Sequence, residues 1–113
     1  MNLRPKVLPL AMIICDNVVT DVATRKKSLF GLFSRIQAKK VPIKHHRLNV
    51  IIVLTEGVGA YDAELKCVYA DTNKSILQIK GKMQFKDPND VVDLIFDLPG
   101  IVFPEFGQYR FEL

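Results

Sequence analysis

The sequence contains no tryptophan, only two histidines and only two cysteines among its 113 residues. The histidines, His45 and His46, are adjacent, so they point to opposite faces if this stretch is extended. Neither cysteine has a second ligand at the short spacing of a zinc site. We therefore expect no metal, no cofactor and no catalytic residue, and we expect that the protein is not an enzyme. One alternative stays open, a hydrolase whose site combines His45 or His46 with a carboxylate in a concave cluster.

The two cysteines, Cys15 and Cys67, each lie within an apolar run. Two buried free thiols in a reducing compartment suit this setting, so we expect a cytoplasmic protein; an extracellular disulfide is the alternative. The beginning, MNLRPKVLPLAMIIC, resembles a signal peptide with a lipid-accepting cysteine. However, Pro9 interrupts its apolar stretch, no small residue precedes Cys15, and the stretch is too short to span a bilayer. We expect a first buried strand here and no membrane contact.

Helical periodicity is also scarce, and a period of two dominates. Apolar residues alternate with polar ones, or form short runs between turn residues, in seven segments: 10–15, 28–36, 48–54, 61–69, 77–85, 92–98 and 109–113. Two of these, 10–15 and 48–54, are apolar on both faces, which predicts central strands covered on both sides. The spacing in 28–36 also fits a helix, but its length and Gly31 favour a strand bulged at that glycine.

These segments predict one domain over residues 1–113. Regular strand spacing with turn residues between strands is typical of an all-β sandwich. We expect an immunoglobulin-like antiparallel β-sandwich of about seven strands, with no substantial helix.

The last segment, FPEFGQYRFEL, carries the clearest strand pattern. After Gly107, the apolar residues Tyr109, Phe111 and Leu113 alternate with polar ones. A tyrosine after a Pro-rich loop resembles the tyrosine corner of immunoglobulin-like sandwiches, in which the hydroxyl bonds back to the upstream backbone. That would make this segment the second-last strand, with no neighbour on its outer side. We therefore expect an uncovered edge at Tyr109, Phe111 and Leu113.

Several segments, taken in order, resemble an uncharacterised, mostly bacterial family of small single-domain all-β proteins, a domain-of-unknown-function family. They are Cys15-Asp16 with Val18, SLFGLFSRI at 28–36, Pro42 followed by His46-Arg47-Leu48, and DLIFDLPGIVFPEFGQYRF at 93–111. The resemblance implies an all-β domain and no assigned activity. Members usually continue past residues 109–111 into a final strand, so the resemblance implies that this chain lacks that strand.

Positive charge is concentrated in the first half of the chain. Residues 1–50 carry ten Lys and Arg against two Asp, a net +8, whereas residues 51–113 carry six against ten Asp and Glu, a net −4. Such asymmetry marks either an anion-binding face or two oppositely charged halves that interleave in one fold. The candidate anion patch consists of Arg25, Lys26, Lys27, Lys39 and Lys40. Its two groups flank the strand at 28–36 and lie roughly 30 Å apart, which argues against one compact phosphate site.

The function that we expect is non-enzymatic protein–protein contact, as a structural or adaptor module. A strand of a partner protein, or a second copy in a homodimer, would pair with the edge formed by Tyr109, Phe111 and Leu113. The alternative is anion or nucleic-acid binding through the basic loops at 25–27 and 39–47.

Overall fold

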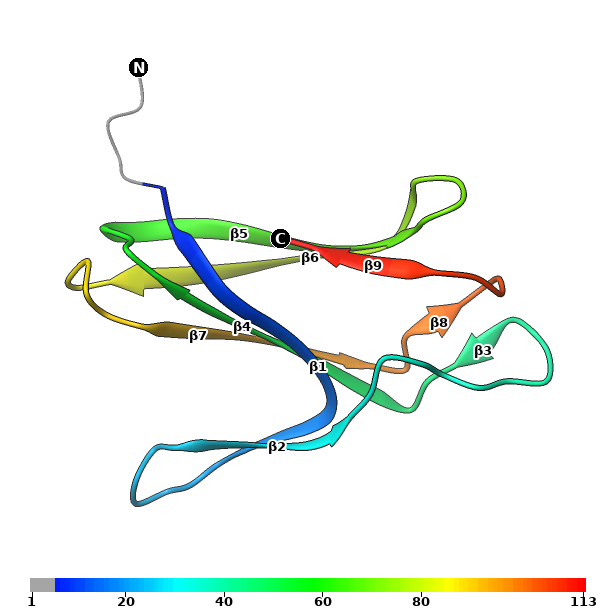
Figure 1. Cartoon of the computed structure of the whole chain (residues 1–113), viewed down its shortest axis with the longest axis horizontal. Helices are drawn as coiled ribbons and strands as arrows, with labels where there is room; N and C mark the ends of the chain where they lie inside the picture. Colours follow the sequence, from blue (N-terminus) through cyan, green and yellow to red (C-terminus); the bar gives the residue numbers. More distant parts are fainter. Residues whose placement is uncertain (1–5) are drawn as a thin grey trace.

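The structure is a computed structural model that describes residues 6–113. Residues 1–5, including Arg4 and the start of the predicted domain, lie outside the described residues. The described chain is all-β and has no helix (Figure 1). Its strands are β1 (Leu8–Thr20), β2 (Lys27–Leu32), β3 (Ile43–Lys44), β4 (Arg47–Thr55), β5 (Gly59–Tyr69), β6 (Lys74–Phe85), β7 (Val92–Pro99), β8 (Val102–Phe103) and β9 (Tyr109–Glu112). The seven expected segments all contain strands, whereas β3 and β8 were not expected.

The strands form three antiparallel sheets. A four-stranded sheet has the order β2-β1-β4-β7, a three-stranded sheet has the order β6-β5-β9, and β3 pairs with β8 in a small sheet. The long strand β1 pairs with β4 over residues 8–15 and with β2 over residues 15–20. Figure 1 shows that the second half of β1 and β2 project as a hairpin below β4 and β7, at one end of the four-stranded sheet.

The hydrophobic core lies between the four-stranded and the three-stranded sheet. One wall is formed by β4 and β7 with Leu48, Val50, Ile52, Leu54, Leu94, Phe96 and Leu98, and the other by β5 and β6 with Ala63, Leu65, Cys67 and Phe85. Burying a single Leu or Phe stabilises a fold by roughly 1.5 to 3 kcal/mol. The core alternates along β5 and β7 as the period of two predicts, which holds the two sheets face to face.

The segment at 28–36 differs from the prediction in two ways. β2 ends at Leu32, and the register of β1 with β2 runs from Cys15 opposite Leu32 to Asn17 opposite Phe30 without a shift, so there is no bulge. Gly31 instead has a positive φ of 72°, and a Cβ there would overlap the Asp16 carboxylate. The glycine therefore permits the close approach of the two strands rather than inserting a residue.

The first half of β1 also differs from the prediction. It is a strand within the sheet, but it is not covered on both sides, because Leu10 is 53% and Met12 is 39% exposed. β4 fulfils the prediction for a covered central strand, since all its residues from Leu48 to Ile52 are buried. Apolar residues on both faces therefore marked the strand correctly, but the facing sheet does not reach the first half of β1.

Ion pairs join the basic and the acidic half of the chain. Lys27 lies 2.9 Å from Asp93 on β7, and the Arg47 side chain donates two hydrogen bonds of 3.2 Å to the Asp97 carboxylate. These contacts support the interpretation that the oppositely charged halves interleave in one fold. No helix in the described part of the chain has the length and hydropathy needed to cross a bilayer.

Candidate functional site

β9 forms one edge of the three-stranded sheet. It pairs with β5 from Lys66 opposite Glu112 to Tyr69 opposite Tyr109. No strand in residues 6–113 pairs with the outer side of β9. β9, which contains Tyr109 and Phe111 of the predicted interface, is therefore an edge strand among the described residues, and a row of backbone polar groups faces outward there.

The hydrogen-bond pattern shows which backbone groups face this edge. The N–H of Ala70 donates to the carbonyl of Gln108 at 2.9 Å, and the register places these two residues opposite one another. Bonded and non-bonded pairs alternate along an antiparallel ladder. Arg110 and Glu112 therefore direct their N–H and C=O groups toward β5, and the N–H and C=O groups of Tyr109 and Phe111 point away from the sheet.

The tyrosine corner fixes the loop that leads into β9. The Tyr109 hydroxyl donates to the Glu105 carbonyl at 2.8 Å and accepts from the Glu105 N–H at 3.1 Å, which is the bond predicted from the sequence. The Tyr69 ring lies 5.0 Å from the Tyr109 ring, and its hydroxyl donates to the Phe106 carbonyl at 2.7 Å. Loss of solvation, followed by the hydrogen bond to Asp71, raises the pKa of Tyr69. Two adjacent residues of the loop, Glu105 and Phe106, are therefore tied to the sheet by tyrosine hydroxyls.

The inner face of β9 packs on the core. Phe111 lies opposite Cys67, which is fully buried, and burial raises the pKa of the Cys67 thiol to about 11. Cys15 is also a free, buried thiol whose pKa is raised by burial, so the predicted pair of buried free cysteines is confirmed. Tyr109 and Phe111 also line a hollow of about 560 Å³, together with Phe33 and Phe103.

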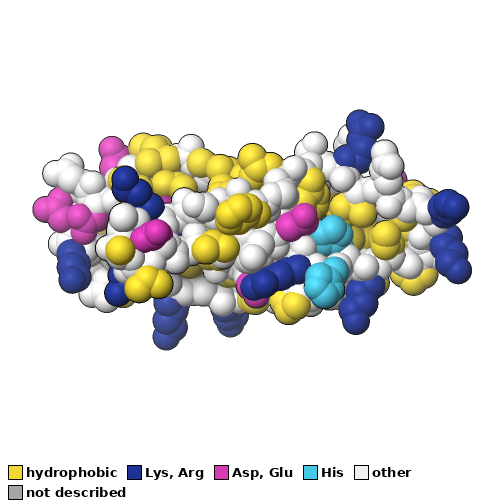
Figure 2. Space-filling view, turned by 90° about the horizontal axis from the view of Figure 1, so that it is seen from below, with side chains coloured by type: hydrophobic (Ala, Val, Ile, Leu, Met, Phe, Trp, Pro, Cys, Tyr) yellow, Lys and Arg dark blue, Asp and Glu magenta, His cyan; other side chains and the backbone are white. Residues whose placement is uncertain are grey.

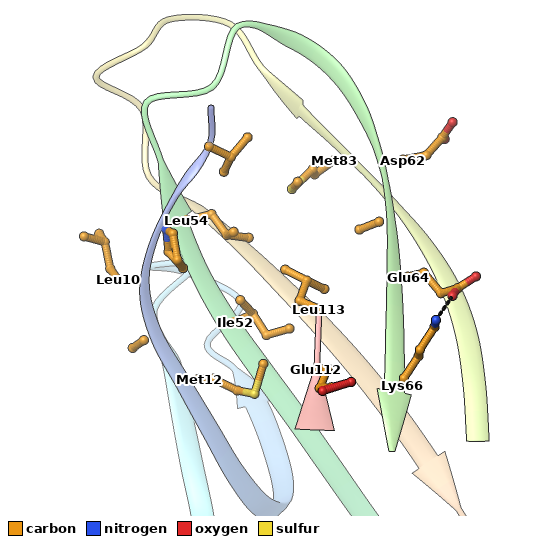
Figure 3. A pocket seen from close by; sticks show the side chains of 14 residues that line it. Leu10, Met12, Ile52, Leu54, Asp62, Glu64, Lys66, Met83, Glu112 and Leu113 are labelled. Carbon is orange, nitrogen blue, oxygen red and sulfur yellow. Dashed lines mark ion pairs between the residues drawn. The ribbon is translucent and has the colours of Figure 1, made fainter. Parts of the chain in front are cut away.

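A larger groove opens beyond the end of β9, between the two main sheets. It encloses about 910 Å³, and its apolar lining includes Leu10, Met12, Ile52, Leu54, Met83 and Leu113. We call it the open groove. In Figure 3, Met12, Ile52 and Leu113 point into it, whereas Asp62, Glu64 and Lys66 stand on the outer face of β5. The pairing of β9 with β5 stops at Lys66, so the side of β5 at residues 62–65 borders the groove.

The outer face of β9 carries charge. The Arg110 guanidinium donates to the Glu112 carboxylate at 2.9 Å and to the Asn73 side-chain oxygen at 2.6 Å. A similar pair, Glu64 with Lys66 at 3.6 Å, lies on neighbouring β5. The edge therefore combines apolar inward side chains, exposed backbone groups and one charge of each sign on the outward face.

Comparison with known protein families matches residues 10–113 to a family of unknown function, DUF6941. The chain belongs to this family. The comparisons found no similar protein among curated sequences and no similar fold among solved structures. Membership of DUF6941 confirms the predicted relation to a domain-of-unknown-function family, and it assigns no activity to the edge or the groove.

The basic residues of this DUF6941 domain do not gather into one patch. Arg25 and Lys26 lie in the turn between β1 and β2, with Lys27 at the start of β2 and bound to Asp93. Lys39 and Lys40 lie in the connection from β2 to β3, at the opposite end of the molecule in Figure 1. On the face in Figure 2, Lys and Arg side chains form separate groups with acidic and apolar side chains between them.

The histidines of the DUF6941 domain lie apart from the groove. His45 Nε2 is 3.5 Å from the Asp16 carboxylate, and the His45 ring lies 5.2 Å from the Phe33 ring. Neither His45 nor Asp16 lines the open groove or the hollow at Tyr109 and Phe111. Among the described residues, no three His, Cys, Asp or Glu side chains form a group that could hold a metal ion.

Sequence reasoning identified the edge of the DUF6941 domain but missed the opposite wall of the groove. Leu10 and Met12 were assigned to a covered strand, although they are among the exposed large apolar residues. One feature of the sequence could have indicated the groove, namely the short length of the last strand. A four-residue β9 cannot cover a 13-residue β1. That argument needs the sheet order, which places β1 and β9 on the same side of the fold.

Proposed function

We propose that this protein is a non-enzymatic module that works through protein–protein contact, by adding a strand to the outer edge of β9. The observation that carries the proposal is the combination at Tyr109 and Phe111 of outward backbone groups with inward apolar side chains. An added strand gains main-chain hydrogen bonds from such an edge and specificity from alternate side chains. The two buried free thiols favour a reducing compartment such as the cytoplasm.

The strand order supports an immunoglobulin-like sandwich as the scaffold. The neighbours β1-β4-β7 correspond to strands A, B and E of that fold, and β5 with β9 correspond to C and F. The Tyr109 hydroxyl bond occupies the place of the tyrosine corner at the start of strand F. In that fold a further strand pairs with F, on the edge that we propose as the contact surface.

Hydrogen exchange tests the proposal directly. The probe is a synthetic peptide with the sequence of residues 108–113, added to the protein, with dilute protein alone as the reference. We expect the peptide, or a high protein concentration, to slow exchange of the outward amides of Tyr109 and Phe111. The inward amides of Arg110 and Glu112 are the internal control, because β5 protects them in every sample. Rapid exchange of the outward amides in all samples would contradict the proposal.

A strand attached covalently provides a second control. A variant extended after Leu113 by an Asn-Gly turn and an alternating strand would cover the edge within one molecule. This variant should protect Tyr109 and Phe111 without peptide and should no longer bind the peptide. Unchanged peptide binding would place the contact elsewhere.

A further inference from the structure

The outer edge of β9 has a self-complementary pattern. Residues whose backbone groups face outward must pair with one another across an antiparallel ladder, so an odd-numbered residue of β9 meets an odd-numbered residue of the added strand. If the added strand is β9 of a second copy, a two-fold axis relates the two strands. The axis must then pass through a residue rather than between two residues.

Charge disfavours two of these registers and favours a third. An axis through Arg110 places Arg110 opposite itself, and an axis through Glu112 places Glu112 opposite itself, which are both repulsive pairs. An axis through Phe111 places Arg110 opposite Glu112 of the second copy, twice by symmetry. Because Arg110 and Glu112 already form a pair of 2.9 Å within one chain, the four side chains would alternate in sign around the axis.

The same register matches the apolar face. Tyr109 lies opposite Leu113 of the second copy, and Phe111 lies opposite its own counterpart, so all inward side chains remain on the core side. Leu113 is 46% exposed in the single chain. This register uses all residues from 109 to 113, whereas an axis through Arg110 leaves Leu113 without an opposite residue in β9.

The edge of β1 lies on the same side of the molecule. β1 pairs with β2 only from Cys15 onward, so no strand of the described chain pairs with the outer side of residues 8–13. Leu8, Leu10 and Met12 are exposed along this stretch, and the open groove separates them from β9. A second copy placed against β9 therefore also stands beside an apolar stretch of the facing sheet.

We infer that the partner at this edge is a second copy of the chain, paired β9 to β9 about a two-fold axis at Phe111. The inference rests on the proposed function, since it names the strand that is added. The dimer joins two three-stranded sheets into one six-stranded sheet, with Arg110 and Glu112 of each copy forming two cross-strand ion pairs.

Charge reversal tests both the partner and the register. Arg110→Glu places a carboxylate opposite Glu112 of the second copy, and Glu112→Arg places a cation opposite Arg110, in both cases twice by symmetry. We expect each variant to raise the dimer dissociation constant about tenfold or more in sedimentation analysis. The double variant, Arg110→Glu with Glu112→Arg, restores opposite charges and should dimerise nearly as the unmodified chain does.

Mixing the two single variants gives the sharpest outcome. One copy then carries Glu at 110 and 112 and the other carries Arg at both, so a one-to-one heterodimer should form from two weakly associating chains. Lys86→Glu, in the turn between β6 and β7, lowers the net charge by as much as Arg110→Glu does and should leave dimerisation unchanged. Circular dichroism of each variant shows whether it is folded, and a misfolded variant is replaced by Arg110→Ala or Glu112→Ala, for which a smaller loss is expected.

Two results would overturn the inference. A chain that stays monomeric while the peptide of residues 108–113 protects the Tyr109 and Phe111 amides leaves the proposed function intact and excludes the second copy as partner. A dimer that tolerates both single charge reversals, or a mixture that forms no heterodimer, excludes this register. Absence of both peptide binding and dimerisation contradicts the proposed function itself.

Discussion

The Tyr109 hydroxyl makes two of the hydrogen bonds that hold the loop before β9. Tyr109 both donates to and accepts from the Glu105 backbone, so Tyr109→Phe removes two hydrogen bonds and leaves the ring in place. Each such bond contributes about 0.5 to 1.5 kcal/mol. We expect a loss of about 1 to 2 kcal/mol in the free energy of unfolding, measured by urea denaturation. Unchanged stability would show that water replaces both bonds. The tyrosine corner would then contribute nothing to the free energy of unfolding.

The buried thiol of Cys67 makes stability depend on pH. Burial raises its pKa from an ordinary value near 9.0 to about 11. Between these values the unfolded chain loses the thiol proton and the native chain keeps it, so the native state binds more protons and stability falls as pH rises. This loss of unfolding free energy should be absent below about pH 9. It should level off above about pH 11, where it reaches about 2 to 3 kcal/mol.

This loss can be isolated by comparison with Cys67→Ala. Urea denaturation from pH 8 to pH 11 measures both chains, and the variant should show a shallower decline because it has no thiol to ionise. Parallel curves for the two chains would contradict the assigned cause. The buried position also predicts that Cys67 reacts with Ellman's reagent only after unfolding.

At the scale of elements, β2 depends on one glycine. Gly31 has a positive φ of 72° and faces the Asp16 carboxylate, so Gly31→Ala adds both backbone strain and a steric overlap. We expect a loss of about 1 to 3 kcal/mol in unfolding free energy. Gly31→Asn should cost less in backbone strain, because asparagine tolerates the left-handed region. If Gly31→Ala proved neutral, the β2 backbone at residue 31 would have to leave the left-handed region and the Asp16 side chain would have to move away.

The strands of the structure also show which elements could be predicted from the sequence. The period of two identified β5, β6, β7 and β9, because their alternate side chains face the core, and short apolar runs between turn residues identified β1, β2 and β4. It could not identify β3 and β8, since two residues carry no period. The bulge expected at Gly31 was wrong, because a glycine in a strand signals either an inserted residue or a close approach, and Asp16 is distant in sequence from Gly31.

The candidate site also has one part that local sequence predicts and one part that depends on contacts between distant segments. The strand at Tyr109 was predictable because its alternation and the preceding Pro-rich loop are both local. The open groove was not predictable, because its walls come from β1, β4, β5 and β6, and only their packing sets them apart. Residues that line a space between sheets have the same composition as residues that fill a core.

At the scale of the whole molecule, we expect the dispersed positive charge to keep nucleic-acid binding weak. The turn between β1 and β2 offers Arg25 and Lys26, because Lys27 is bound to Asp93, and Lys39 and Lys40 lie at the other end. Two neutralised phosphates give a slope of about −2 when the logarithm of the binding constant is plotted against that of salt concentration. Fluorescence anisotropy with labelled DNA measures it. A slope of about −5 or steeper would show a gathered patch and revive the basic-loop alternative.

The path of the chain through β1 sets the order in which the fold can assemble. β5 and β6 are joined by one short turn at Asn73, so their eleven-residue register can close locally and early. β1 must instead find β4 from Leu8 opposite Thr55 onward, and β4 must find β7 from Arg47 opposite Pro99 onward. Such non-local pairing is slow, on the order of milliseconds to seconds. During this interval the exposed apolar side of β1 has no partner, so dilute protein should refold with a higher yield than concentrated protein.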